Sequence, residues 1–203
     1  MSGAVELGEA VRRLMNASVL SNADASLMAE ATEQINAIAG QLEDAGMRET
    51  MQLPDEDGMR RGDRPYSPVI GAANPIAPPM SVTALEDESV VGKCTMHPIH
   101  EGPPGAIHGG WVGMLLDQLL GHATAASGNR GFTAELTVRY RRPTPYGVPL
   151  TLRGRTDGVD GRRVYTSAEI VVDNVVTAEA KGLFLTPSPE RMAELRQTIT
   201  ARS

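Results

Sequence analysis

Residues 102–127 read GPPGAIHGGWVGMLLDQLLGHATAAS, and from Trp111 onwards this stretch is dominated by apolar side chains. The residues from about 109 to 126 fit a helix that is apolar almost all round, which is typical of a helix buried on most of its sides. The Gly-Pro-Pro-Gly sequence at its start predicts a sharp turn into that helix. Asp117 is the exception, because a carboxylate placed among leucines needs a partner or a function.

Segments with strand character surround this helix. We expect two strands before it, within 79–86 and 90–98, and four after it, within 132–142, 149–156, 162–172 and 175–186. In the first segment after the helix, Leu136, Val138 and Tyr140 alternate with polar residues and should share one face. Because most connections after the helix are too short for parallel crossovers, the order ββαββββ predicts an antiparallel α+β fold. One helix enclosed by one curved sheet is the hotdog arrangement.

The rest of the chain differs in composition and in the spacing of its apolar residues. Residues 1–50 show helical spacing of apolar positions, with Asn22 or Asp24 as a cap for a second helix and Gly46 as its stop. Residues 51–79 hold six prolines, which disfavour both helix and central strand and predict a linker or covering segment. We therefore divide the chain into an N-terminal helical extension (1–50), this segment (51–79), a central domain (80–187) and a C-terminal tail with helical character (188–203).

Composition excludes several function classes. The net charge is −6, and residues 1–50 are acidic, so nucleic acid is not an expected partner. No apolar run is long enough for a membrane span, and the N-terminus lacks the pattern of a signal peptide. The single cysteine, Cys94, excludes an intramolecular disulfide and fits a small buried hydrophobe. These features favour a cytoplasmic globular protein.

The start of the apolar helix has the chemistry of an oxyanion hole. Its first amides lack intrahelical acceptors, and Gly109 and Gly110 would let a carbonyl oxygen approach them closely. Asp117 lies eight residues further on, about 12 Å along the axis. One Asp can hardly reach the start of its own helix over that distance. A dimer that joins the glycines of one subunit to the Asp of the other fits better.

These motifs resemble a known family. GPPGAIHGGWVGMLLDQLLG followed by FTAELTVRYRRPTP is similar to the PaaI-type and mammalian mitochondrial acyl-CoA thioesterases of the hotdog, or 4-hydroxybenzoyl-CoA thioesterase, superfamily. The resemblance covers about residues 80–186. It implies hydrolysis of a fatty or aromatic acyl-CoA to a free acid and CoA, with no cofactor, by a homodimer or a dimer of dimers.

The resemblance also implies roles for individual residues. Asp117 matches the catalytic carboxylate, as general base or nucleophile. Gly109 matches the glycine whose amide polarises the thioester carbonyl, with Gly110 beside it. His108 matches a histidine that shapes the turn, and Thr133 matches a hydroxyl residue that helps to place the water.

Four further residues are candidates for binding the substrate. Arg141 and Arg142 match a basic pair that would contact CoA phosphates, although both also fit an exposed strand end. Many members of the family carry Asn or Gln where this chain has Gly102, and Glu101 or a water is then the substitute. Glu135 is a second polar candidate, expected on the same strand face as Thr133.

Other interpretations stay open from the sequence. Asp117 also fits a polar gap or an ion pair with an arginine across an interface. The domain also fits an acyl-CoA-binding or sensing module without hydrolysis, which would not need Asp117 together with the glycine turn. A hydratase would need a histidine paired with the carboxylate, and His122 points about 140° away from Asp117 on a helix. His97 and His100 have His-x-x-His spacing in a loop without a third ligand, so no metal site is expected.

Overall fold

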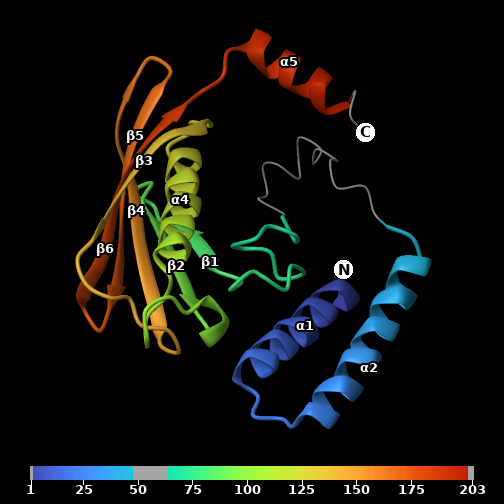
Figure 1. The fold of residues 1–203 in the computed structure, drawn as a ribbon. Helices are drawn as coiled ribbons and strands as arrows, with labels where there is room; N and C mark the ends of the chain where they lie inside the picture. Colours follow the sequence, from blue (N-terminus) through green and yellow to red (C-terminus); the bar gives the residue numbers. More distant parts are fainter. Residues whose placement is uncertain (1, 48–63, 201–203) are drawn as a thin grey trace.

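The structure is a computed structural model that describes residues 2–47 and 64–200. Within these residues, one antiparallel sheet of six strands carries a long helix against one face (Figure 1). In chain order the elements are α1 (Ser2–Leu20), α2 (Ala25–Asp44), β1 (Ser81–Ala84), β2 (Val90–Thr95), the 3-10 turn η1 (Pro98–His100), α4 (Gly109–Ala126), β3 (Phe132–Tyr140), β4 (Pro149–Asp160), β5 (Arg163–Val172), β6 (Val175–Leu185) and α5 (Pro189–Thr200). The strands lie in the order β1-β2-β4-β5-β6-β3. This arrangement confirms the predicted hotdog fold.

Helix α4 is the centre of the core and has the bounds that the sequence predicts. Its side chains without any exposed surface are Leu115, Leu116, Leu119, Leu120 and Ala123. The sheet lets the helix approach closely because glycines face it. A Cβ built on Gly92 or on Gly154 would lie 3.1 Å from a methyl carbon of Leu119. The apolar helix therefore lies in a sheet surface that is hollowed to receive it.

Side-chain alternation along the strands agrees with the sequence pattern. In β5 the residues that face α4 are buried, and they include Val164, Ala168, Ile170 and Val172. In β3, Leu136, Val138 and Tyr140 pair with Gly182, Ala180 and Ala178 of β6, whose side of the sheet faces the helix. Among the described residues, strand β3 pairs with β6 alone, so the backbone groups on its other side form an open sheet edge there.

One prediction about β3 is wrong. Thr133 pairs with Phe184 and Glu135 pairs with Leu183, because a β-bulge interrupts the register between these two residues of β3. Phe184 is buried on the helix side, whereas its neighbour Leu183 points the other way. Glu135 therefore lies on the sheet face opposite to Thr133, and the alternation expected from the sequence fails at the extra residue.

The N-terminal helices lie on the side of α4 away from the sheet (Figure 1). Helix α2 begins at the predicted cap, where Asp24 Oδ1 accepts a hydrogen bond of 2.9 Å from the Leu27 amide. It is followed by Gly46, the predicted stop, at φ 95°. None of its side chains is buried, although its apolar residues form one stripe.

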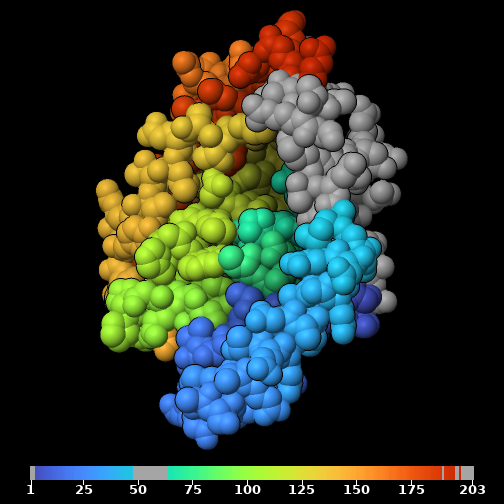
Figure 2. Space-filling model, turned by 45° about the vertical axis from the view of Figure 1, so that its right-hand side comes forward, coloured from blue at the N-terminus to red at the C-terminus, as the bar shows by residue number. Residues whose placement is uncertain are grey.

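Residues 64–79 contain neither helix nor strand, as the prolines predict, while residues 51–63 of the predicted segment and residues 48–50 of the N-terminal extension lie outside the described residues. Figure 2 shows residues 64–80 at the surface between α2 and the residues around α4. The C-terminal tail contains α5, within the predicted range. The division of the chain at residues 50, 79 and 187 stays a prediction. None of the described helices is long and apolar enough to cross a membrane.

Candidate active site

The amides of Gly109 and Gly110, which the sequence predicts as one oxyanion hole, differ in their hydrogen bonding in the first turn of α4. His108 is the N-cap, and its Nδ1 accepts a hydrogen bond of 3.0 Å from the Gly110 amide. The His108 carbonyl accepts from the amides of Trp111 and Val112. Within the described residues, the Gly109 amide donates no hydrogen bond. Gly109 therefore offers the amide that is available to a ligand at this helix end.

The turn before α4 is held by backbone contacts at close range. The Gly102 amide donates to the Ala106 carbonyl, and the His108 amide donates to the His100 carbonyl. A Cβ built on Gly102 would lie 2.7 Å from the Cα of His108. This backbone has no room for the Asn or Gln side chain that many members of the family carry there.

Glu101 supports this turn. Its Oε1 accepts hydrogen bonds from the Gly105 amide, at 2.8 Å, and from the Tyr146 hydroxyl, at 3.1 Å. The hydrogen bond to Glu101 raises the pKa of Tyr146. The Ile107 amide donates to the Thr144 carbonyl and fixes the turn to the segment after β3. In this chain, Glu101 therefore holds the loop that leads into Gly109.

Asp117 has a partner on the neighbouring strand. The Thr133 hydroxyl donates a hydrogen bond of 2.8 Å to Asp117 Oδ1, and it joins the middle of α4 to the start of β3. The Asp117 side chain is half-buried. Within the described residues no arginine or lysine forms an ion pair with it. The hydroxyl orients one carboxylate oxygen and leaves Oδ2 to meet a water or a substrate.

A groove of about 370 Å³ opens beside Gly109. Its lining is mainly apolar, with two arginines at the strand end: Pro103, Ala106, Ile107, Gly109, Val112, Tyr140, Arg141, Arg142, Pro143 and Thr144. Arg141 donates to Glu179 Oε2 at 2.8 and 3.1 Å, and this contact lowers the pKa of the exposed Glu179. Arg142 forms no ion pair among the described residues. Of the two arginines, Arg142 is the one available to an anionic ligand.

Tyr140 contacts Gly109, and the sequence did not identify it as a site residue. Its hydroxyl donates a hydrogen bond of 2.9 Å to the Gly109 carbonyl. Its place after Leu136 and Val138 in the alternation of β3 was the available signal, because it predicted a tyrosine on the helix side of the sheet.

The histidines outside the motif have structural contacts. His100 is 1% exposed, accepts from the His97 amide through Nδ1, and packs edge-on against Trp111 with ring centres 4.5 Å apart. Burial lowers the pKa of His100, and burial followed by the charge of Arg64 lowers the pKa of His122. Among the described residues, no group of three or more potential ligands could hold a metal ion.

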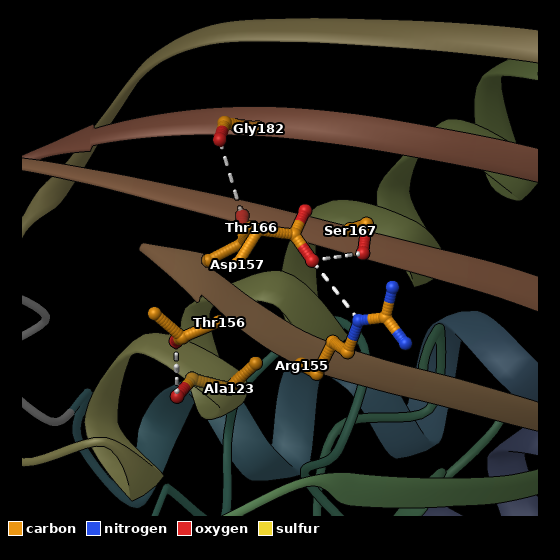
Figure 3. A network of polar contacts seen from close by, with 7 residues as sticks. All are labelled: Ala123, Arg155, Thr156, Asp157, Thr166, Ser167 and Gly182. Atoms are coloured by element: carbon orange, nitrogen blue, oxygen red, sulfur yellow. Dashed lines mark hydrogen bonds and ion pairs between the residues drawn. The ribbon is translucent and has the colours of Figure 1, made fainter. Parts of the chain in front are cut away.

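A second polar cluster lies on the sheet face away from α4 (Figure 3). Asp157 Oδ1 accepts from Arg155, at 3.0 Å, and from the Ser167 hydroxyl, at 2.9 Å. The adjacent Thr156 and Thr166 point inward, and the Thr156 hydroxyl donates to the Ala123 carbonyl of α4. Because the outer cluster is exposed, its contacts add little stability. Because the sheet separates it from Asp117, its residues are suitable control variants.

Comparisons with known proteins agree on the fold. The family described as "Thioesterase superfamily" matches residues 104–179. A crystal structure of a thioesterase superfamily protein is 38% identical with a TM-score of 0.79, and the match covers 90% of this chain and 94% of that one. A Streptococcus mutans protein bound to acetyl-CoA is 17% identical with a TM-score of 0.51 over 54% of this chain and 89% of that one, which supports the fold alone.

The curated relatives are acyl-coenzyme A thioesterases. The protein THEM4 of Xenopus laevis is 34% identical over 94 residues, which are 45% of this chain and 42% of the relative. THEM4 of Bos taurus is 31% identical over 96 residues, which are 46% of this chain and 39% of the relative. The matched region thus spans less than half the length of either relative.

Proposed function

The chain belongs to the thioesterase superfamily, and from this premise we propose that it hydrolyses an acyl-CoA thioester to a free acid and CoA. The observation that carries the proposal is the hydrogen bond of 2.8 Å between Thr133 and Asp117, in a helix whose side chains are mostly apolar. A half-buried carboxylate oriented by one hydroxyl and free at its other oxygen suits a general base or a nucleophile.

The chemistry assigns one role to the start of α4 and another to its middle. The Gly109 amide donates to the thioester carbonyl oxygen and stabilises the negative charge that develops there. Asp117 either takes a proton from a water that attacks the carbonyl carbon or attacks that carbon itself. The carbon–sulfur bond then breaks, and the CoA sulfur leaves with the electron pair and takes up a proton. In the second route, water later hydrolyses the acyl-Asp117 anhydride.

The complete site needs two subunits. Gly109 and Asp117 lie eight residues apart on one helix, or about 12 Å, which is too far for both to act on one carbonyl. We propose a homodimer in which Gly109 of one subunit faces Asp117 of the other. The open edge of β3 carries Thr133 and could extend the sheet into a second subunit.

Substrate recognition is assigned to the groove beside Gly109. Its apolar lining suits the pantetheine arm and the start of the acyl chain, and Arg142 lies where a CoA phosphate could be bound. Arg141 is engaged with Glu179 and contributes to the same positive region. Glu101 acts through the turn, and Glu135, on the outer sheet face, is not part of the proposed site.

The first experiment measures thiol release from short, long and aromatic acyl-CoAs by the wild type and by Asp117→Ala. Asp117→Ala should lower kcat by about 100-fold or more, the scale of a lost general base. Asp157→Ala, which removes a carboxylate from the outer sheet face, is the matched control and should retain wild-type kcat. Burial raises the pKa of Cys94 to about 12, so this thiol should give little background with a thiol reagent.

The same assay separates hydrolysis from binding alone. A wild type that binds acyl-CoA and never releases CoA would overturn the proposal in favour of a binding or sensing module. Equal activity of the wild type and Asp117→Ala would remove Asp117 from the mechanism and leave the fold assignment untouched.

A further inference from the structure

The peptide group between Gly109 and Gly110 is held at both of its polar atoms. Its carbonyl oxygen, on Gly109, accepts the hydrogen bond of 2.9 Å from the Tyr140 hydroxyl. Its N–H, on Gly110, donates to His108 Nδ1 at 3.0 Å. A peptide group is planar, so two contacts at opposite ends fix its orientation about the helix axis. The next peptide group toward the N-terminus carries the amide of Gly109, a residue that lines the groove, and this amide has no hydrogen-bond partner in the described residues.

The Tyr140 hydroxyl is not required to satisfy the Gly109 carbonyl. A carbonyl in the first turn of a helix ordinarily accepts from the amide four residues on. Tyr140 is 55% exposed, so its hydroxyl could bond to water at little cost. Yet its ring lies against Gly109, where an added Cβ would be 3.3 Å from the hydroxyl oxygen and 3.4 Å from the ring. Tyr140 therefore contacts Gly109 through both its hydroxyl group and its ring.

Strand β3 carries supports for the start and the middle of α4. Thr133 binds Asp117 near the start of the strand, and Tyr140 binds the Gly109 carbonyl at its end. Both residues lie on the helix side of β3. The same strand thus contacts both the carboxylate and the glycine peptide of this helix.

We propose that Tyr140 is a positioning residue for catalysis, which holds the Gly109–Gly110 peptide and thereby orients the adjoining Gly109 amide toward the thioester carbonyl. This inference rests on the proposed thioesterase function. Tyr140 acts through Gly109 and does not itself transfer a proton. Its loss should therefore lower the rate of the chemical step more than it weakens the binding of CoA.

The test compares Tyr140→Phe with Tyr165→Phe. Tyr140→Phe keeps the ring against Gly109 and removes only the hydroxyl, so the melting temperature should stay within about 2 °C. The value of kcat should fall by about tenfold, the scale of one hydrogen bond, while Kd for CoA should change less than about twofold. Tyr165 is an exposed tyrosine on β5, and its conversion to Phe should leave kcat unchanged.

A spectroscopic readout separates positioning from a general structural effect. In an Asp117→Ala background, the carbonyl stretch of a ¹³C-labelled acyl-CoA should shift to lower frequency on binding, because a donor polarises the carbonyl. Adding Tyr140→Phe should reduce that shift, and adding Tyr165→Phe should not. An unchanged stretch together with wild-type kcat in Tyr140→Phe would overturn the proposal.

Failure of the proposed function has a different signature. If the wild type hydrolyses no acyl-CoA, the function is wrong, and the role of Tyr140 in catalysis is wrong with it. The contact itself is tested separately in the free protein, where Tyr140→Phe should shift the NMR resonances of the Gly109 carbonyl and the Gly110 amide. Activity in the wild type with no change in these resonances or in kcat would reject Tyr140 alone.

Discussion

At the residue scale, the proposed function rests on the contact between Asp117 and Thr133. The hydroxyl fixes one carboxylate oxygen at 2.8 Å and narrows the directions in which the other can point. Thr133 is exposed on an edge strand, where it contributes little to folding. Its substitution should therefore change activity more than stability.

We expect Thr133→Val to lower kcat by about tenfold with little change in melting temperature, because Val keeps the shape of Thr and removes the donor to Asp117. Steady-state kinetics of thiol release measures this, and Thr133→Ser, which restores a hydroxyl, should recover most of the rate. Thr137→Val on the opposite face of β3 is the control. If the Val and Ser variants were equally slow, a hydrogen bond could not be the cause.

The sequence predicted this pair of residues and misplaced a third. Asp117 stands out because it interrupts an apolar helix, and Thr133 followed from the family resemblance. Glu135 was assigned to the same face by simple alternation, and the bulge after Thr133 reverses that face. Bulges have no reliable sequence signal, so a period of two fails wherever one residue is added.

At the scale of elements, the turn 101–108 fixes where α4 begins. Gly102 is the residue that permits it, because its α-carbon faces the backbone of His108 with no room for a side chain. Glu101 and the segment after β3 hold the other side of the turn. The position of the Gly109 amide therefore depends on the packing of two backbone segments.

Gly102→Ala should displace His108 and the start of α4, because its Cβ would lie 2.7 Å from a backbone atom that cannot rotate away. We expect kcat to fall by at least tenfold and the free energy of unfolding to decrease by about 1–3 kcal/mol. Urea denaturation and thiol release measure the two effects. Gly40→Ala, in α2 with open space around it, should be neutral or slightly stabilising. Wild-type activity in Gly102→Ala would show that the turn tolerates a shift.

Most helices and strands of the domain were predictable from the sequence. The local sequence was not sufficient to predict where some of them end. The bounds of α4 follow from its cap and its apolar run. Strand β1 is shorter than the pattern indicated, and it ends at Ala84 on an edge of the sheet where one neighbour supports it. Strand β4 runs on to Asp160, past the expected break at Thr156, because a bulge near Gly158 lets it keep pairing with β5.

At the scale of the whole molecule, a buried cation on α1 binds the segment that precedes β1. The Arg12 side chain is 9% exposed and donates to the backbone carbonyls of Ala72, Asn74 and Ala77. Nothing in the sequence marked Arg12, since an arginine in an amphipathic helix ordinarily lies at the surface. Its partners are more than fifty residues away, in a segment where the prolines leave carbonyls without strand partners.

Arg12→Ala should release α1 from residues 72–77. A hydrogen bond to a charged donor contributes about 1.5–3 kcal/mol to stability. In Arg12→Ala, three backbone carbonyls lose their donor at once. We expect the amides of α1 to exchange with deuterium at least about 30-fold faster, while the amides of α4 and the sheet keep their protection. Arg13→Ala removes the exposed neighbouring arginine and should leave exchange in α1 unchanged. Faster exchange throughout the sheet in Arg12→Ala would instead mean that α1 and the hotdog core unfold as one cooperative unit, and that the N-terminal helices contribute to the stability of the catalytic domain.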